Sequence, residues 1–345
     1  MIINTVDGVQ VKGIVGCAPS NEIKTSQYPY FDEEQAINFE KATGIRSRRI
    51  VDGPVCTSDL CEAAIIRLLD ILDWDKSDIK VLIHISQSPE RGIPSTAIIM
   101  QNRLGFSEGV IAFDVNLGCS AYPYGFYLMN TIMSSLPVGS KGILSVGDIS
   151  SLGCEPSNKA TAALFSDVGT ATAFEHTIDV SQTQYNFYSD GSGADVITVL
   201  PAGPASRYPN EKPYLKMNGP DVFSFAISKV PSMIKESLSS SHIPTDSLDY
   251  SVLHQANLMV NKRIVKKSKI DHIPSLTSIQ DYGNTSAGSI PFTIAVNIKE
   301  LSRDTNFLLV GFGVGLSWAS VVTSFPSGFI SDLVYLDCKS FTPPL

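Results

Sequence analysis

Apolar residues along the chain alternate between the spacing typical of helices and the short continuous runs typical of buried strands. Residues 57–72 carry apolar side chains at helical spacing, and Asp59 with Glu62 predicts a capping box at the start of this helix. Residues 80–86 form an almost continuous β-branched run, as expected of a strand buried on both faces. Another helix and a strand over 109–116 follow, so the pattern predicts an α/β protein with a mainly parallel sheet.

Two segments repeat the same order of features. DVNLGCSA at 114–121 and DYGNTSAG at 281–288 each follow a predicted strand and place a polar residue, Cys119 or Asn284, before small residues and a helix. An apolar strand ending in Val-Gly comes next, with its Gly 28 residues after Cys119 and 27 residues after Asn284. The repeat predicts that the chain consists of two duplicated halves.

The two predicted halves are residues 1–175 and 176–345. Residues 175–215 would join them as a long surface excursion, because SDGSGAD and PAGPASRYPNEKP have the Gly, Pro, Ser and Asn content of loops.

Composition narrows the class of protein. The 345 residues are 43% apolar and 17% charged, which is typical of a well-packed globular protein. A net charge of −8 argues against broad nucleic-acid binding. Six cysteines without a CxxC pair argue against a disulfide scaffold, and no metal site is predicted. The chain shows no signal peptide and no apolar run of about 18 residues, so we expect a soluble cytoplasmic protein without a membrane span.

Three polar residues stand at predicted junctions of strand and helix. Cys119 and Asn284 occupy equivalent points of the repeat, and His254 ends the strand-like part of 250–257. Binding crevices of open α/β sheets form at strand ends, so these side chains can converge. A helix N-terminus lowers the pKa of a thiol, and His and Asn can donate N–H groups to a developing oxyanion. The pattern predicts acyl transfer to a thiol, followed by enolate formation from a thioester.

A purely structural interpretation exists for each of these residues. Cys119 can be a small buried apolar side chain, and His254 and Asn284 can serve turns. Composition and spacing alone leave both interpretations of Cys119 open.

Five ordered motifs resemble one enzyme family. They are TGIRSRRI (43–50), FDVNLGCSA (113–121), LHQAN (253–257), GNTSAGSIP (283–291) and the final GFGVG (311–315). Together they resemble 3-ketoacyl-acyl-carrier-protein synthase III (beta-ketoacyl-ACP synthase III), a thiolase-fold condensing enzyme of fatty acid biosynthesis. The resemblance implies a thiolase-like fold whose duplicated halves form a layered α/β/α/β/α core. Residues 326–345 extend beyond the usual end of that family.

The resemblance also implies a reaction. Cys119, His254 and Asn284 match the family's catalytic triad, and the backbone N–H groups of Cys119 and Val314 match its oxyanion hole. Such an acyltransferase carries an acyl primer as a thioester on Cys119. It condenses the primer with malonyl-acyl-carrier protein, with loss of CO₂, to give a 3-ketoacyl thioester. It needs no cofactor beyond the coenzyme A or phosphopantetheine of its substrates, and it commonly forms a homodimer.

Several positions depart from the family pattern. Asn38 and Leu152 stand where a Trp and an Arg often hold the adenine of coenzyme A, and Ile93 stands where a Phe often enters the partner's acyl pocket. The departures at Asn38 and Leu152 suggest a primer delivered by carrier protein in a specialised pathway. The smaller side chain of Ile93 in the acyl pocket could admit a different or larger acyl group. Candidate residues for docking an acidic acyl carrier protein are Lys262, Arg263, Lys266 and Lys267, which can equally form a solvated helix face.

Two departures concern the backbone near the nucleophile. Gly313-Val314-Gly315 replaces a turn of three glycines, and Pro123 follows Cys119 by four residues. The proline predicts a helix that starts late or has a distorted first turn.

Other activities fit parts of the pattern. An acyltransferase of the same fold could pass the acyl group from Cys119 to an alcohol or amine without decarboxylation. A thiol hydrolase also orders its residues Cys, His, Asn, but the CGSCW-type motif is absent. A further alternative is a catalytically silent partner subunit that only binds acyl carrier. The chain retains all three triad residues, which argues against this alternative.

Overall fold

The structure, a computed structural model, describes residues 3–178, 182–200 and 212–343. The first sheet has the strand order β16 (Ile330–Leu336), β2 (Val9–Pro19), β8 (Asp167–His176), β7 (Lys141–Ile149), β5 (Ile79–Ile85) and β6 (Ile111–Val115). The second sheet has the order β1 (Ile3–Val6), β9 (Thr183–Ser189), β15 (Ser317–Phe325), β14 (Thr305–Gly313), β12 (Tyr250–Leu253) and β13 (Ser275–Leu276). Two short ribbons pair β3 (Glu22–Lys24) with β4 (Ser47–Arg49), and β10 (Ile197–Thr198) with β11 (Lys216–Met217).

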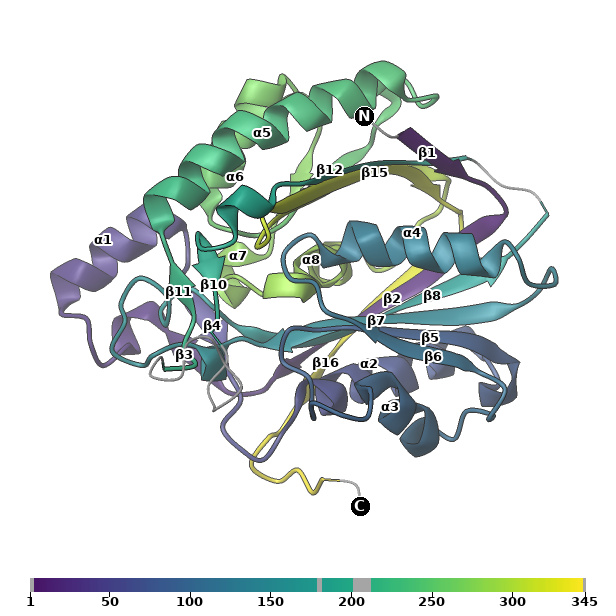
Figure 1. Cartoon of the computed structure of the whole chain (residues 1–345), viewed down its shortest axis with the longest axis horizontal. Coiled ribbons are helices and arrows are strands. Elements are labelled where there is room, and N and C mark those ends of the chain that lie inside the picture. The colour runs from purple at the N-terminus through teal and green to yellow at the C-terminus, as the bar shows by residue number, and fades with distance from the viewer. Residues whose placement is uncertain (1–2, 179–181, 201–211, 344–345) are drawn as a thin grey trace.

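The helices of the described residues form layers around the two sheets (Figure 1). They are α1 (Glu33–Thr43), α2 (Thr57–Leu72), α3 (Thr96–Leu104), α4 (Ala121–Met133), α5 (Gly219–Ser240), α6 (Leu258–Ser268), α7 (Ile279–Tyr282) and α8 (Ser289–Asn297). α4 and α8 lie between the sheets, α2 and α3 cover the outer face of the first sheet, and α5 and α6 cover the second. This is the predicted α/β/α/β/α arrangement.

The two sheets share one connection order. In the first sheet, β2, β8 and β7 are antiparallel neighbours, and β7, β5 and β6 are parallel neighbours. In the second sheet, β9, β15 and β14 are antiparallel, and β14, β12 and β13 are parallel. The predicted mainly parallel order therefore holds for the strands that lead to the candidate site and for the edge pair β16 and β2, but not for the middle of either sheet. The division of the chain at residue 175 stays a prediction, and it falls at the end of β8.

The terminal strands are exchanged between the sheets. β1, at the start of the chain, pairs with β9 of the second sheet, and β16, near the end, pairs with β2 of the first. β16 lies within 326–345, so this extension completes an edge of the first sheet. Arg67 anchors it through Asp332, with 2.7 Å between Nε and Oδ2.

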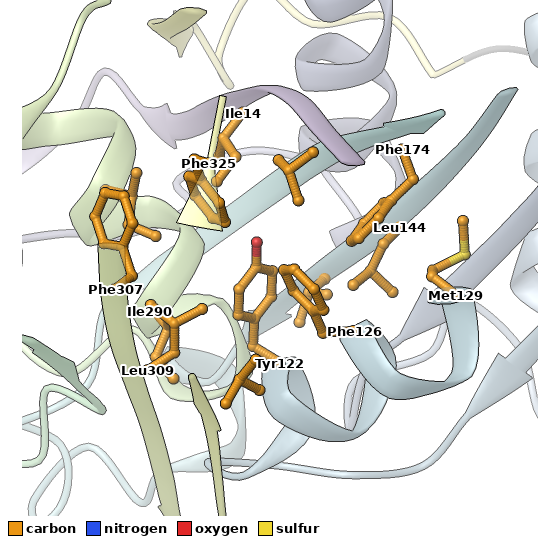
Figure 2. Close-up of a cluster of buried hydrophobic side chains, with 14 of the residues drawn as sticks. Ile14, Tyr122, Phe126, Met129, Leu144, Phe174, Ile290, Phe307, Leu309 and Phe325 are labelled. Carbon is orange, nitrogen blue, oxygen red and sulfur yellow. The ribbon is translucent and has the colours of Figure 1, made fainter. Parts of the chain in front are cut away.

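The main core lies between the two sheets (Figure 2). Tyr122 and Phe126 of α4 are buried there and stack edge to face, with ring centroids 5.9 Å apart. Phe126 also meets Phe174 of the first sheet and Phe325 of the second. Burying large aromatic side chains contributes about 1.5–3 kcal/mol each, so this layer fixes the two sheets against each other.

Two predictions about local structure need correction. The helix over 57–72 is confirmed, but its cap is Cys56, whose N–H donates to Asp59 Oδ2 at 2.7 Å, whereas Glu62 faces Arg103. The joint predicted over 175–215 is not only a surface excursion, because Thr183–Ser189 forms β9 inside the second sheet.

Most of PAGPASRYPNEKP (201–213) lies outside the described residues. Among the described residues, no helix is long and apolar enough to cross a membrane.

Candidate active site

Cys119, His254 and Asn284 line one cavity of about 620 Å³. Cys119 follows β6, His254 follows β12, and Val314 follows β14, so parallel strands of both sheets deliver them to one place. Strand ends therefore bring Cys119 and His254 together, and Asn284 reaches the same cavity from the loop after α7.

The loop before α4 presents the thiol. Ser120 is the N-cap of α4, and the Ala121 N–H donates to the Gly118 carbonyl at 2.8 Å. Pro123 is the third helical residue, a first-turn position at which a backbone N–H would have no partner within the helix, so the proline costs α4 no internal hydrogen bond. A Cβ on Gly313 would lie 2.6 Å from that of Cys119, which explains why glycine is required there.

Burial raises the pKa of the Cys119 thiol to about 12, and the nearby charge of Asp148 adds to the rise. Hydrogen bonds from the backbones of Val314 and of Cys119 itself act in the opposite direction. The low thiol pKa predicted from the helix N-terminus is therefore wrong for the free protein, because lost solvation outweighs these donors.

The backbone N–H groups of Cys119 and Val314, which the resemblance assigns to the oxyanion hole, both face the sulfur of Cys119. In the Gly313-Val314-Gly315 turn, Gly315 has the left-handed φ, at 136°. Because the left-handed φ falls on Gly315 and not on Val314, the change from the family's middle glycine to Val314 leaves the backbone N–H donor in place. The side chains of Val314 and Gln87 both lie close to Gly118, where an added Cβ would meet them.

His254 is buried at the end of β12. The backbone N–H of His254 donates to the Val310 carbonyl of β14 at 2.7 Å. The His254 ring meets the Phe312 ring edge to face, with 5.5 Å between the ring centroids. Burial lowers the pKa of His254 to about 3, against a backbone hydrogen bond with Ser286, so the imidazole is neutral. Nδ1 is buried without a hydrogen-bond partner in the described structure.

Asn284 does not follow a strand, as the repeat predicted, but the one-turn helix α7 and Gly283. Its backbone bonds to Leu164 and Ser166, each at 2.9 Å. The Ser286 N–H donates to Asn284 Oδ1 at 2.9 Å. Because Oδ1 is engaged as an acceptor, the amide NH₂ is available as a donor in the cavity.

Sequence reasoning missed Asp148, a 2% exposed carboxylate that lines the same cavity. The signal was present, since Asp148 is the single acidic residue of strand β7 and lies one residue before its end. Gln87, after β5, was also missed and lines the cavity beside Gly118.

The remaining predicted residues lie at the rim or outside the cavity. Leu152 lines the cavity and is 68% exposed, whereas Asn38 lies on the exposed side of α1. Ile93 is 88% exposed and does not line the cavity of its own chain. The four candidate docking residues, Lys262, Arg263, Lys266 and Lys267, lie on the exposed side of α6.

The layered fold and a thiol faced by two backbone donors define an acyltransferase-type condensing enzyme of the thiolase fold. Residues 113–195 match the family described as 3-oxoacyl-[acyl-carrier-protein (ACP)] synthase III, and residues 238–325 match its C-terminal family. A beta-ketoacyl-[acyl-carrier-protein] synthase III of Alkalilimnicola ehrlichii is 30% identical over 295 residues, or 82% of this chain and 89% of its own. That of Clostridium perfringens is 31% identical over 312 residues, or 88% and 95%. The chain belongs to the 3-oxoacyl-acyl-carrier-protein synthase III family.

A solved structure supports the same assignment. The 3-oxoacyl-(acyl-carrier protein) synthase of Burkholderia xenovorans LB400 matches with a TM-score of 0.92 at 30% identity, covering 97% of this chain and 99% of its own. Because the match leaves 3% of this chain uncovered, it includes part of residues 326–345. The extension is therefore shared, at least in part, with that structure.

Proposed function

We propose that this protein catalyses decarboxylative Claisen condensation of an acyl primer, held as a thioester on Cys119, with malonyl-acyl-carrier protein. The product is a 3-ketoacyl thioester. The observation that carries the proposal is the single cavity in which Cys119, His254 and Asn284 meet the Val314 N–H.

In the first half-reaction, Cys119 Sγ attacks the carbonyl carbon of the primer thioester. The carbonyl oxygen becomes an oxyanion beside the N–H groups of Cys119 and Val314. The carrier thiolate leaves and takes up the proton that the Cys119 thiol gives up. Because burial raises the pKa of the Cys119 thiol, we expect deprotonation to accompany the attack, with the proton passing to the leaving carrier thiolate.

In the second half-reaction, His254 and Asn284 donate hydrogen bonds to the thioester oxygen of the malonyl group. Loss of CO₂ leaves its electron pair on the adjacent carbon as an enolate, whose negative oxygen these donors stabilise. The enolate carbon attacks the acyl carbonyl, and the Cys119 thiolate leaves and is protonated. A neutral His254 suits this role, since it donates a hydrogen bond without a proton transfer.

We propose an acyl carrier protein as the source of the primer as well, in a specialised pathway. Leu152 provides no cation at the cavity mouth, and Asn38 provides no aromatic ring. The adenine of a coenzyme A primer would therefore lack both of the contacts that usually hold it in this family. Arg263 lies over the Phe223 ring, 5.2 Å from its centroid, and Phe223 lines the cavity. This contact with a lining residue supports a docking role for Arg263 and its basic neighbours on α6, which would meet an acidic carrier.

We further propose that two copies of the chain pair along β6, which is an edge strand of the first sheet. Ile111 of β6 and Ile98 of α3, which packs against β6, are 42% and 48% exposed, and Ile93 in the loop before α3 is 88% exposed. A second copy would cover them and bring its Ile93 toward this chain's cavity. We expect a dimer by light scattering and a monomer for Ile111→Lys, while a monomeric unmodified protein would refute the proposal.

The experiment that tests the condensation is CO₂ release from malonyl-acyl-carrier protein in the presence of a panel of acyl donors. We expect release that depends on the donor and on Cys119. If acyl groups instead pass to an added alcohol or amine and no donor gives CO₂, the protein is an acyltransferase without decarboxylation. Neither reaction requires a cofactor beyond the carriers of its substrates.

A further inference from the structure

Asp148 is a buried carboxylate to which the proposed reaction gives no role. It lies near the end of β7, is 2% exposed and lines the cavity with Cys119, His254 and Asn284. A negative charge beside a site that forms an enolate opposes the reaction unless other groups compensate the charge. The hydrogen bonds that Asp148 accepts therefore decide whether its negative charge is compensated.

Both oxygens of Asp148 accept hydrogen bonds, and they do so from different parts of the molecule. Oδ1 accepts from Gln87 N at 2.7 Å, from Ser86 Oγ at 3.0 Å and from Ser88 Oγ at 3.4 Å, all in the loop after β5. Oδ2 accepts from Ala287 N at 3.2 Å, in the turn after Asn284. The carboxylate thus ties the loop beside the nucleophile to a turn 139 residues away in the sequence.

The turn at Ser286 orients both donors of the second half-reaction. Ser286 has a left-handed φ of 47°, which is uncommon for a residue other than glycine. Its N–H fixes Oδ1 of Asn284, and its backbone bonds to His254. A shift of this turn would move both donors relative to the thioester oxygen.

We propose that Asp148 is a positioning residue that holds the Ser286–Ala287 turn, so that Asn284 and His254 point at the thioester oxygen of the malonyl group. This role rests on the proposed condensation. A carboxylate is required because donors approach both of its oxygens. An amide in its place would keep the Gln87 contact and turn an NH₂ group toward the Ala287 N–H, which would displace the turn.

The test separates the two half-reactions in Asp148→Asn. We expect the rate of Cys119 acylation by an acyl thioester, followed by intact mass, to stay within about threefold of the unmodified protein. We expect CO₂ release from malonyl-carrier protein by the acyl-enzyme to fall about 10²-fold, the loss typical of a misplaced oxyanion donor. Equal loss in both steps would overturn the proposal.

The pH profile of Cys119 alkylation by iodoacetamide reports the charge beside the thiol in the same variant. Asp148 raises the pKa of this thiol, so removing the carboxylate should shift the alkylation profile to lower pH. A shifted profile together with an unchanged ratio of the two half-reactions would show that Asp148 acts only through its charge and would overturn the positioning role.

A matched control is Asp167→Asn, which alters another fully buried carboxylate, bonded to Val51 and Ser151 and outside the cavity lining. It should leave the ratio of the two half-reactions unchanged. Should Asp148→Asn fail to fold, Ser86→Ala removes one donor to Oδ1, and a severalfold loss confined to CO₂ release is expected. Absence of CO₂ from the unmodified protein would refute the condensation itself and this role with it.

Discussion

The floor of the cavity and its mouth are built differently. At the floor, His254 and Asp148 are each 2% exposed, and hydrogen bonds from both sheets hold the groups that would act on substrate. At the mouth, Leu152 and Val199 are 68% and 50% exposed and provide only apolar contact. The floor tolerates few substitutions because each buried polar group depends on its partners, whereas side chains at the mouth can change at little cost. A chain can therefore keep the reaction of its family while changing the carrier that it recognises.

The acidity of the thiol gives the largest expected effect at the floor. Because burial raises the pKa of Cys119 to about 12, the thiol is protonated at neutral pH and the thiolate fraction grows as pH rises. Alkylation of Cys119 by iodoacetamide should accelerate about tenfold per pH unit from about pH 7 to about pH 10. A plateau near neutral pH would show that the thiolate is already formed in the free protein.

Substitution of Asn284 should give the next largest effect. In Asn284→Asp, Oδ1 can still accept from the Ser286 N–H, but the group that faces the thioester oxygen becomes an acceptor. CO₂ release should fall about 10²- to 10³-fold, while acylation of Cys119 changes little. Asn297→Ala is a control outside the cavity lining, and an equal loss there would remove the special role of Asn284.

The smallest effect is expected at the mouth. Leu152→Arg with Asn38→Trp supplies a cation and an aromatic ring to the adenine of coenzyme A. The KM for an acyl-CoA primer should fall about two- to fivefold, with kcat unchanged, in steady-state kinetics. If the unmodified protein already prefers acyl-CoA over acyl-carrier protein, the contrast between floor and mouth fails.

Local pattern was enough to predict most of the fold. The helix over Thr57–Leu72 and the strands β5, β7 and β14 follow directly from their apolar spacing. Strand β9 was not predicted, because its polar residues alternate with Tyr185 and Phe187 between loop-like segments. Its place in the second sheet depends on pairing with β15, which is distant in the sequence.

The candidate site was predictable where residues stand at the ends of elements. Cys119 and His254 are adjacent to a helix start and a strand end, so their positions could be inferred from order alone. The role proposed for Asp148 depends on its bond to Ala287, and the raised pKa of Cys119 depends on burial by both sheets. Such long-range contacts leave no local pattern in the sequence.

Intact mass spectrometry of the acyl-enzyme tests the central claim most directly. Cys119→Ala should abolish the acyl adduct, whereas Cys56→Ala, which removes another thiol of the cavity lining, should retain it. Malonyl-acyl-carrier protein should then discharge the adduct with release of one CO₂ per 3-ketoacyl product. An adduct that persists in Cys119→Ala, or that is discharged without CO₂, would contradict the account.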